Sequence, residues 1–159
     1  KGIRYIDEAS NIEVFGAIDD IWENINTKEL YIIDYKSTSK KGDPDIDTGW
    51  GLSYKRQMEI YQWLFRKNGF PISDVGYFLY VNGVKGDNKF FSDHIGYETT
   101  GFMEFSTTLI AYEGNADWVS DILIEIKETL LEDKLPPANQ NFDDNRYFYE
   151  RLKIESKFG

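Results

Sequence analysis

Apolar residues alternate with polar ones, or run together, in several short segments of the chain, and these segments predict β-strands. The first three are residues 3–8, residues 12–22 and residues 30–36. The second and third are apolar on both faces, which is typical of strands that are covered on both sides. Residues 24–28 lie between them and predict the turn of a β-hairpin. Three more strands are predicted at residues 75–82, 89–95 and 101–112.

Two longer segments have the spacing of amphipathic helices. Residues 53–67 predict a helix that ends at Asn68-Gly69, after a polar, glycine-rich stretch at residues 37–51 that we expect to be a mobile loop. The apolar stripe of this helix comprises Tyr54, Met58, Tyr61, Leu64 and Phe65. Its polar side is expected to comprise Lys55, Arg56, Glu59, Gln62 and Arg66.

A second helix is predicted to follow an N-cap at Asn115 and to end at Pro136-Pro137. A short third helix is predicted over residues 144–154. Together these elements predict an α/β fold, a central mixed β-sheet flanked by helices, in a single domain over residues 1–159. Because the chain begins at Lys1 rather than at a methionine, we expect it to be a fragment of a longer protein. The apolar positions of the second helix are Val119, Ile122, Leu123, Ile126 and Leu130.

Two carboxylates are predicted to face each other across the hairpin. Equal counting outward from a turn centred near Asn26 and Thr27 places Asp19 opposite Asp34, with Cβ atoms about 4.5–5.5 Å apart. Like charges at that distance are destabilising without a partner, and a buried unpaired carboxylate is costly. A divalent cation removes both costs, so the pair indicates a site for Mg²⁺ or Mn²⁺. A shift of one residue in the register would bring Asp20 to the site instead of Asp19.

Lys36 follows two residues after Asp34, and residues with this spacing share one face of a strand. Asp19, Asp34 and Lys36 should therefore project into one pocket. An ammonium group there can stabilise developing negative charge or position a water molecule for attack. The alternative is purely structural: Lys36 forms a salt bridge with Asp34 at a strand edge, and Asp19 is solvated.

Two further side chains each leave a choice between a functional and a structural interpretation. Gln57 lies on the border of the apolar stripe, one turn before Tyr61. Either both reach the mouth of the pocket and touch the metal site or a DNA phosphate, or Gln57 bonds to sheet backbone and Tyr61 packs in the core. Trp50, in the polar loop, either stacks on an unpaired base or packs against the protein.

Together these segments resemble the PD-(D/E)XK nuclease superfamily and, within it, the RecB-type exonuclease domains. The three motifs occur in the family's order as Gly16-Ala17-Ile18-Asp19, Asp34-Tyr35-Lys36 and Gln57-Met58-Glu59-Ile60-Tyr61. The resemblance implies a restriction-endonuclease-like core and a Mg²⁺- or Mn²⁺-dependent deoxyribonuclease that hydrolyses phosphodiester bonds. It implies that Asp19 and Asp34 are catalytic metal ligands, helped by the main-chain carbonyl of Tyr35. Lys36 would be the catalytic lysine.

The resemblance also implies where the substrate lies. Gln57 and Tyr61 would be near it, and we expect Lys55 and Arg56 of the same helix to bind it. The expected substrate is DNA, as single strands or duplex ends, delivered by a helicase or another domain of a longer chain. Gly16 would permit close packing or mark a bulge. Family members commonly add a metal ligand from a helix before the first strand, and we expect this helix to be missing here.

Composition limits these expectations. The chain has no cysteine, which excludes disulfides, cysteine-ligated zinc and the iron–sulfur cluster that closes many relatives. The net charge of −10 is unfavourable for binding nucleic acid. The charge and the missing upstream ligand favour an alternative, a catalytically inactive nuclease fold that binds DNA or acts as a scaffold. A third possibility is an unrelated α+β interaction domain in which the motifs are coincidental. No apolar run approaches the roughly 20 residues that span a membrane, and no signal peptide is visible. We therefore expect a cytoplasmic protein without membrane contact.

Overall fold

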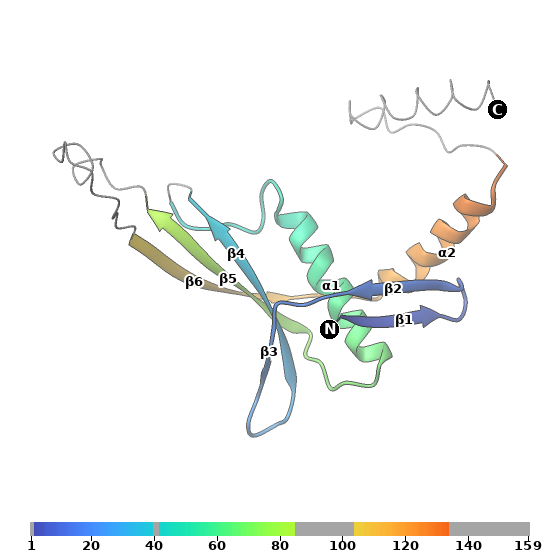
Figure 1. Ribbon diagram of the computed structural model, residues 1–159, viewed down its shortest axis with the longest axis horizontal. Helices are drawn as coiled ribbons and strands as arrows, with labels where there is room; N and C mark the ends of the chain where they lie inside the picture. The colour runs from blue at the N-terminus through green and yellow to red at the C-terminus, as the bar shows by residue number, and fades with distance from the viewer. Residues whose placement is uncertain (1, 40–41, 85–103, 134–159) are drawn as a thin grey trace, which may run out of the picture.

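The computed structural model describes residues 2–39, 42–84 and 104–133. The predicted strand at residues 89–95, the predicted helix at residues 144–154 and Pro136-Pro137 lie outside these residues. Neither helix in the described part of the chain is long and apolar enough to cross a membrane. The elements follow in the order β1 (Ile3–Asp7), β2 (Ile12–Gly16), β3 (Asp20–Glu23), β4 (Leu30–Thr38), α1 (Gly51–Lys67), β5 (Val75–Val84), β6 (Glu104–Glu113) and α2 (Trp118–Leu131) (Figure 1).

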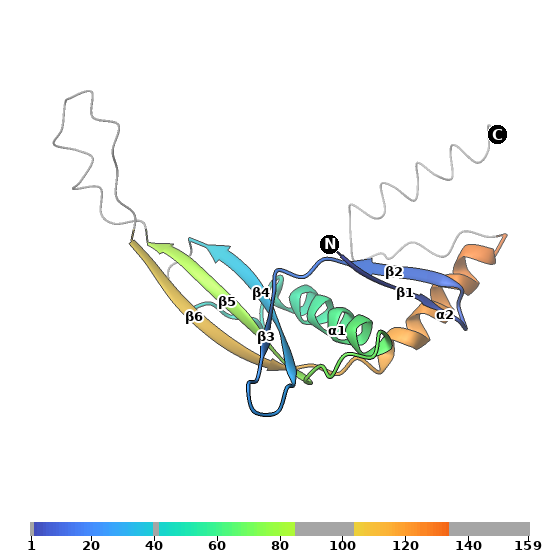
Figure 2. The same cartoon turned by 60° about the horizontal axis from the view of Figure 1, so that its bottom comes forward.

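Four of the strands form a mixed sheet in the order β3-β4-β5-β6. β3 is antiparallel to β4, β5 is parallel to β4, and β6 is antiparallel to β5. Parallel neighbours require a crossover connection, and α1 supplies it between β4 and β5. β1 and β2 form a separate antiparallel pair (Figure 2). This arrangement confirms the predicted α/β fold with a central mixed sheet.

The segment predicted as one strand over residues 12–22 is two strands in two different sheets. β2 ends at Gly16, and the next strand begins at Asp20. Between these strands, Asp19 Oδ2 accepts a hydrogen bond from the N–H of Tyr35 at 2.8 Å. At the start of β3, Asp20 Oδ1 accepts one from the N–H of Ile21 at 2.8 Å. Side-chain acceptors of this kind compete with ladder hydrogen bonds. The chain therefore leaves the β1–β2 pair here and enters the main sheet.

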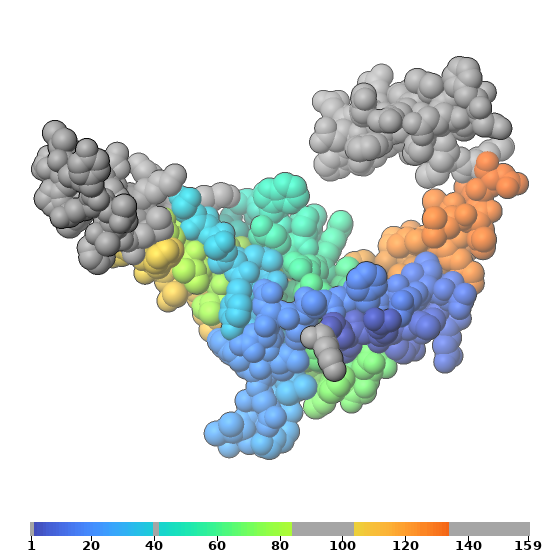
Figure 3. Space-filling view, viewed as in Figure 1, coloured from blue at the N-terminus to red at the C-terminus, as the bar shows by residue number. Residues whose placement is uncertain are grey.

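The core lies on both sides of α1. Met58 and Phe65 pack with Ile32 of the main sheet. Trp63 and Leu64 pack with β1, β2 and α2. Figure 3 shows β1 and β2 in front of the middle of α1, whose two ends remain visible above and below them. Full burial of one such apolar side chain contributes about 1.5–3 kcal/mol. Residues of the apolar stripe predicted for this helix therefore stabilise both parts of the core.

The polar side predicted for α1 is partly buried. Glu59 is only 9% exposed. Its Oε1 accepts hydrogen bonds from the hydroxyl of Tyr112 at 2.6 Å and the N–H of Asn115 at 3.2 Å. Its Oε2 accepts one from Trp118 Nε1 at 2.7 Å. Glu59 is buried because the connection between β6 and α2 covers this side of the helix.

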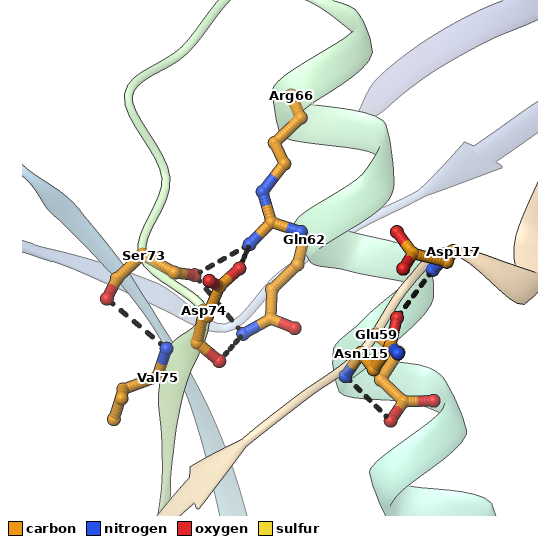
Figure 4. Close-up of polar contacts among 8 residues, drawn as sticks. All are labelled: Glu59, Gln62, Arg66, Ser73, Asp74, Val75, Asn115 and Asp117. Atoms are coloured by element: carbon orange, nitrogen blue, oxygen red, sulfur yellow. Dashed lines mark hydrogen bonds and ion pairs between the residues drawn. The ribbon is translucent and has the colours of Figure 1, made fainter.

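Gln62 is a second exception on the same side of α1, because it is fully buried. Its Nε2 donates to the carbonyl oxygens of Ser73 at 3.3 Å and Asp74 at 2.7 Å. Arg66, one turn later, donates to the same Ser73 carbonyl at 3.2 Å and pairs with the Asp74 carboxylate. Figure 4 shows both side chains reaching the turn that leads into β5. These polar residues fix the end of the crossover.

The N-cap of α2 is Asp117 rather than the predicted Asn115. Asn115 Oδ1 accepts a hydrogen bond from the N–H of Asp117 at 2.9 Å, so Asn115 forms a turn before the helix instead of capping it. Val119 and Leu123, in the first half of α2, are buried as predicted. The predicted apolar positions of its second half, beginning with Ile126, are exposed.

Candidate active site

Asp34 is a buried carboxylate in the middle of β4. Its side chain is 7% exposed, and Ile33 before it is fully buried. Among the described residues its Oδ2 makes no hydrogen bond of normal geometry, although Lys36 Nζ lies 2.5 Å from it as an ion-pair partner. Burial raises the pKa of Asp34 above its usual value; Lys36 opposes this rise and the charge of Asp19 adds to it. The site therefore holds a carboxylate whose ionised form is poorly solvated.

The β3–β4 hairpin brings Asp19 beside this carboxylate. Asp20 pairs with Ile33, which is the register expected from equal counting and places Asp19 next to Asp34. Asp19 Oδ2 accepts the N–H of Tyr35. A strand residue directs its N–H and C=O toward the same side. The carbonyl of Tyr35 therefore faces the same gap, at the point where β3 has not yet begun.

Asp20, the alternative to Asp19, lies on the opposite face of the sheet. Its Oδ2 accepts hydrogen bonds from the hydroxyl of Tyr35 at 2.5 Å and from Trp22 Nε1 at 3.3 Å. The bond from Tyr35 is the main reason why the pKa of Asp20 is lowered. Neighbouring strand residues point to opposite faces, so the side chain of Tyr35 lies on the other face from Asp34. The carboxylate of Asp20 is therefore directed away from the buried one.

Lys36 connects the strand motif to the helix motif. Its Nζ donates to Gln57 Oε1 at 3.4 Å, and Gln57 Nε2 donates to the hydroxyl of Tyr61 at 2.9 Å. The ammonium also lies 4.2 Å from the centre of the Tyr54 ring, within cation–π range. These contacts connect Gln57 to the side chain of Lys36 rather than to sheet backbone. One continuous chain of polar contacts thus runs from Asp34 to α1.

Gly16, at the end of β2, lies directly against the ring of Tyr61. A Cβ atom at this position would be 2.6 Å from Tyr61 Cε1. Any side chain there would displace the ring, because packed interiors tolerate little added volume. Close packing therefore accounts for this glycine, and the first motif helps to hold the third.

The two basic residues expected to bind substrate have other surroundings. Lys55 pairs with Asp47, and its Nζ lies 5.4 Å from the centre of the Tyr112 ring. Arg56 is exposed on the surface of α1. These contacts do not join Lys55 to the polar chain that starts at Asp34. A substrate role for either residue stays a prediction.

Two tyrosines at the site were not identified from the sequence. Tyr54 lies under the Lys36 ammonium, and the spacing of three residues between Tyr54 and Gln57 on one helix face was a usable signal. Tyr80 is the β5 partner of Lys36 in the β4–β5 register and is 6% exposed. Burial raises its pKa. No sequence signal indicates Tyr80, because no tight turn sets the register of parallel strands.

The available oxygens fit a divalent cation that keeps part of its water shell. Within residues 2–39, 42–84 and 104–133, no three carboxylate or histidine side chains gather to hold a metal ion. The available set is the carboxylates of Asp34 and Asp19 with the carbonyl of Tyr35. Mg²⁺ is commonly bound by one or two carboxylates together with water, so this set is sufficient. The Asp34 oxygen without a hydrogen bond of normal geometry is an atom that a cation would satisfy.

Comparison with known proteins agrees with this geometry. A search of curated proteins gives no match. The family model of the PD-(D/E)XK nuclease superfamily matches residues 3–141, a range that contains all three motifs and every strand and helix described above. A match over this share of the 159 residues excludes an unrelated interaction domain in which the motifs are coincidental. The chain belongs to the PD-(D/E)XK nuclease superfamily.

Proposed function

We propose that this chain is a metal-dependent deoxyribonuclease of the RecB type that hydrolyses phosphodiester bonds in DNA. Asp19 and Asp34, with the main-chain carbonyl of Tyr35, would hold Mg²⁺ or Mn²⁺. Lys36 would be the catalytic lysine. The membership of a nuclease superfamily supports the general activity, while the metal, the residue roles and DNA as substrate are our inference.

One observation carries the proposal: the Lys36 ammonium contacts both the buried carboxylate of Asp34 and the amide of Gln57. Residues from β4 and α1, 21 positions apart, thus meet at a single charged group. A purely structural salt bridge at a strand edge would not require Gln57 and Tyr61 to extend it into a chain of polar contacts. It would also not require the carboxylate to be buried.

The chemistry follows from the charges. A bound divalent ion would polarise the phosphate and lower the pKa of water. Lys36 would stabilise the negative charge that develops on the phosphate, in a partly buried site where such an interaction is strong. Gln57 would hold the ammonium in place through its Oε1, while the hydroxyl of Tyr61 fixes the amide by accepting a hydrogen bond from its Nε2. Asp34 is desolvated, which favours a cation as its partner.

The RecB-type helix motif favours processing of DNA ends or single strands over internal cutting of duplexes. Gln57 and Tyr61 stand on α1, beside the lysine rather than on a separate surface loop. We therefore propose an exonuclease-like activity, with DNA delivered by a helicase or another domain. Delivery by a partner would also compensate for the net charge of −10, which weakens unaided binding to a polyanion.

A second candidate is an inactive member of the same fold that binds DNA or serves as a scaffold. The net charge and the absence of a third carboxylate or histidine ligand among the described residues favour it. Against it stands the cost of keeping Asp34 buried beside Asp19 without a ligand. Metal-dependent cleavage separates the two candidates.

The test is cleavage of end-labelled single- and double-stranded DNA in Mn²⁺ or Mg²⁺ by the wild type and by Lys36→Ala. We expect metal-dependent cleavage that falls by at least about 100-fold in the variant, since removal of one charge-stabilising group typically costs that much. A ladder of products shortened from one end would establish an exonuclease.

Lys28→Ala is the matched control, because Lys28 also pairs with a carboxylate, Glu23, but is 69% exposed and lies in the hairpin turn. We expect it to cleave like the wild type. Equal activity of the Lys36 and Lys28 variants would contradict the assignment of the site. Absence of cleavage by the wild type with either metal would favour the inactive fold.

A further inference from the structure

A pocket of about 380 Å³ opens beside Lys36, between the end of β4, the loop before α1 and the first turn of α1. Its wall runs from Tyr80, which is buried, past Tyr54 to Trp50, which is 74% exposed. Asp19 and Asp34 do not line it. Its volume lies in the range of about 300–1,000 Å³ that is typical of small-ligand sites. It is therefore a separate subsite that shares Lys36 with the candidate metal centre.

The loop that closes this pocket is held in place by three kinds of contact. Ile46 is buried in the main core, and a Cβ atom on Gly51 would lie 2.0 Å from the Ile46 carbonyl oxygen. The two carboxylate oxygens of Asp45 accept hydrogen bonds from the N–H of Asp47 at 2.7 Å and from the Thr48 hydroxyl at 2.8 Å. Asp47 in turn pairs with a lysine of α1. The pocket is thus largely pre-formed.

The chemistry of the wall suits a nucleobase better than a phosphate. Three aromatic side chains line it, and aromatic rings provide stacking surfaces for any base. Asp43 and Asp45 also line it, and their negative charges would repel a phosphate. The exocyclic amino and ring N–H groups of bases, in contrast, donate hydrogen bonds that carboxylates can accept. Lys36 is the cation that joins this wall to the place proposed for the scissile phosphate.

We propose that this pocket receives one unpaired nucleobase next to the phosphodiester bond that is cut, with Trp50 as its exposed stacking surface. This inference rests on the nuclease function proposed above and adds to it a binding site for the base beside the cleaved bond, with Trp50 as the residue that contacts it. A base paired inside a duplex cannot enter the pocket, so intact duplex is a poor substrate.

The exposure of Trp50 argues against the interpretation that this side chain packs against the protein. A tryptophan that packs against the protein loses most of its accessible surface, whereas three-quarters of Trp50 remains in contact with solvent. Replacing Trp50 should therefore leave the fold intact, and the proposed pocket predicts that it weakens base binding. Phe15, which is 76% exposed on β2, offers a control of equal exposure outside the pocket.

The experiment compares binding of a fluorescent oligothymidylate and of an abasic oligomer of the same length, by anisotropy in Ca²⁺ with strand integrity checked on a gel. The wild type is expected to prefer the oligothymidylate. In Trp50→Ala this preference should fall by about 5- to 150-fold, the range for loss of one stacked base. Phe15→Ala should keep it.

Equal affinity of the wild type for the two oligomers, or an unchanged preference in Trp50→Ala, would overturn the pocket assignment. Cleavage of single-stranded DNA in Mn²⁺ is measured on the same samples. If the protein cleaves DNA but its binding does not depend on the base, only the pocket assignment is contradicted. If binding depends on the base but no cleavage occurs, the proposed nuclease activity is contradicted. The two failures are therefore distinguishable.

Discussion

Replacing Asp34 by asparagine is expected to stabilise the metal-free protein at neutral pH while removing a proposed ligand of the metal. Burial is the largest cause of the raised pKa of this carboxyl, so the ionised form is disfavoured in the folded state. Asparagine has nearly the same shape and no charge. A residue kept at a cost to stability is typical of a functional site.

The sign of the pH dependence follows from that raised pKa. The folded protein binds the Asp34 proton more tightly than the unfolded chain, so stability falls as the pH rises through the folded-state pKa. Below the unfolded-state value of 3.8 the carboxyl is protonated in both states and the penalty disappears. The advantage of Asp34→Asn should therefore be absent near pH 3.8, grow as the pH rises and become constant above the folded-state pKa.

The magnitude follows from two opposing effects on the ionised carboxylate. Its desolvation costs about 1–3 kcal/mol, and the ion pair of Asp34 with Lys36 offsets part of this cost. We expect a net stabilisation of about 1–2 kcal/mol at neutral pH. For a domain of 159 residues this corresponds to a rise in Tm of about 2–8 °C.

The assay is thermal unfolding followed by circular dichroism in EDTA, from about pH 2.5 to pH 8, so that the range extends below the unfolded-state value of 3.8. Asp7→Asn is the matched control, because Asp7 is also buried but accepts hydrogen bonds from the N–H and the hydroxyl of Ser10, which lower its pKa. The control should lose stability at neutral pH, and this loss should shrink only as the pH falls below the unfolded-state value of 3.8. A lower Tm for Asp34→Asn at neutral pH would refute the reasoning, since Asp34 would then be a stabilising salt-bridge partner.

Substitutions at Gln57, Gly16 and Glu59 test further contacts made by α1. Gln57→Ala removes the acceptor of Lys36 and should lower kcat by about 10- to 100-fold in the DNA cleavage assay, while Gln57→Glu, which keeps an acceptor, should retain more activity. Gly16→Ala should destabilise the protein by about 1–3 kcal/mol in urea unfolding, and less so when Tyr61→Leu removes the ring it meets. Glu59→Gln places an amide where the carboxylate accepts three hydrogen bonds and should cost about 1–3 kcal/mol in the same assay; an unchanged midpoint would mean that this network does not hold the α2 connection.

The strand motif and the hairpin could be predicted from the sequence because their determinants are local. A short turn fixes the register of antiparallel strands, so equal counting placed Asp19 beside Asp34 correctly. The apolar run that ends in Asp34, followed by Lys36 two residues later, marks a central strand with two polar side chains on one face. These residues depend on no distant part of the chain for their arrangement.

The break between β2 and β3 could not be predicted because distant residues cause it. Apolar residues on both faces indicate a covered strand but do not show which sheet the strand joins. The change of sheet depends on the packing of Gly16 against Tyr61 and on the hydrogen bond between Asp19 and Tyr35. Both partners lie 16 residues or more along the chain.

The same limitation explains two features that the sequence did not predict, the burial of Glu59 on α1 and the position of Tyr80 beside Lys36. A glutamate on the polar side of a helix is usually exposed to solvent. Glu59 is instead buried by Tyr112 and Trp118, more than 50 residues later in the chain. Tyr80 meets Lys36 only through the parallel register that the crossover sets. Helical spacing predicts which residues share a face, but not which face will be covered.

Calorimetric titration of Mn²⁺ into the wild type and into Asp34→Asn tests the central claim most directly, because it does not depend on finding the right DNA. The wild type should bind the ion with a saturable heat, and Asp34→Asn, which is expected to be at least as stable, should lose that binding. Equal binding by both proteins, or none by either, would contradict the assignment of Asp34 to a metal-dependent nuclease site.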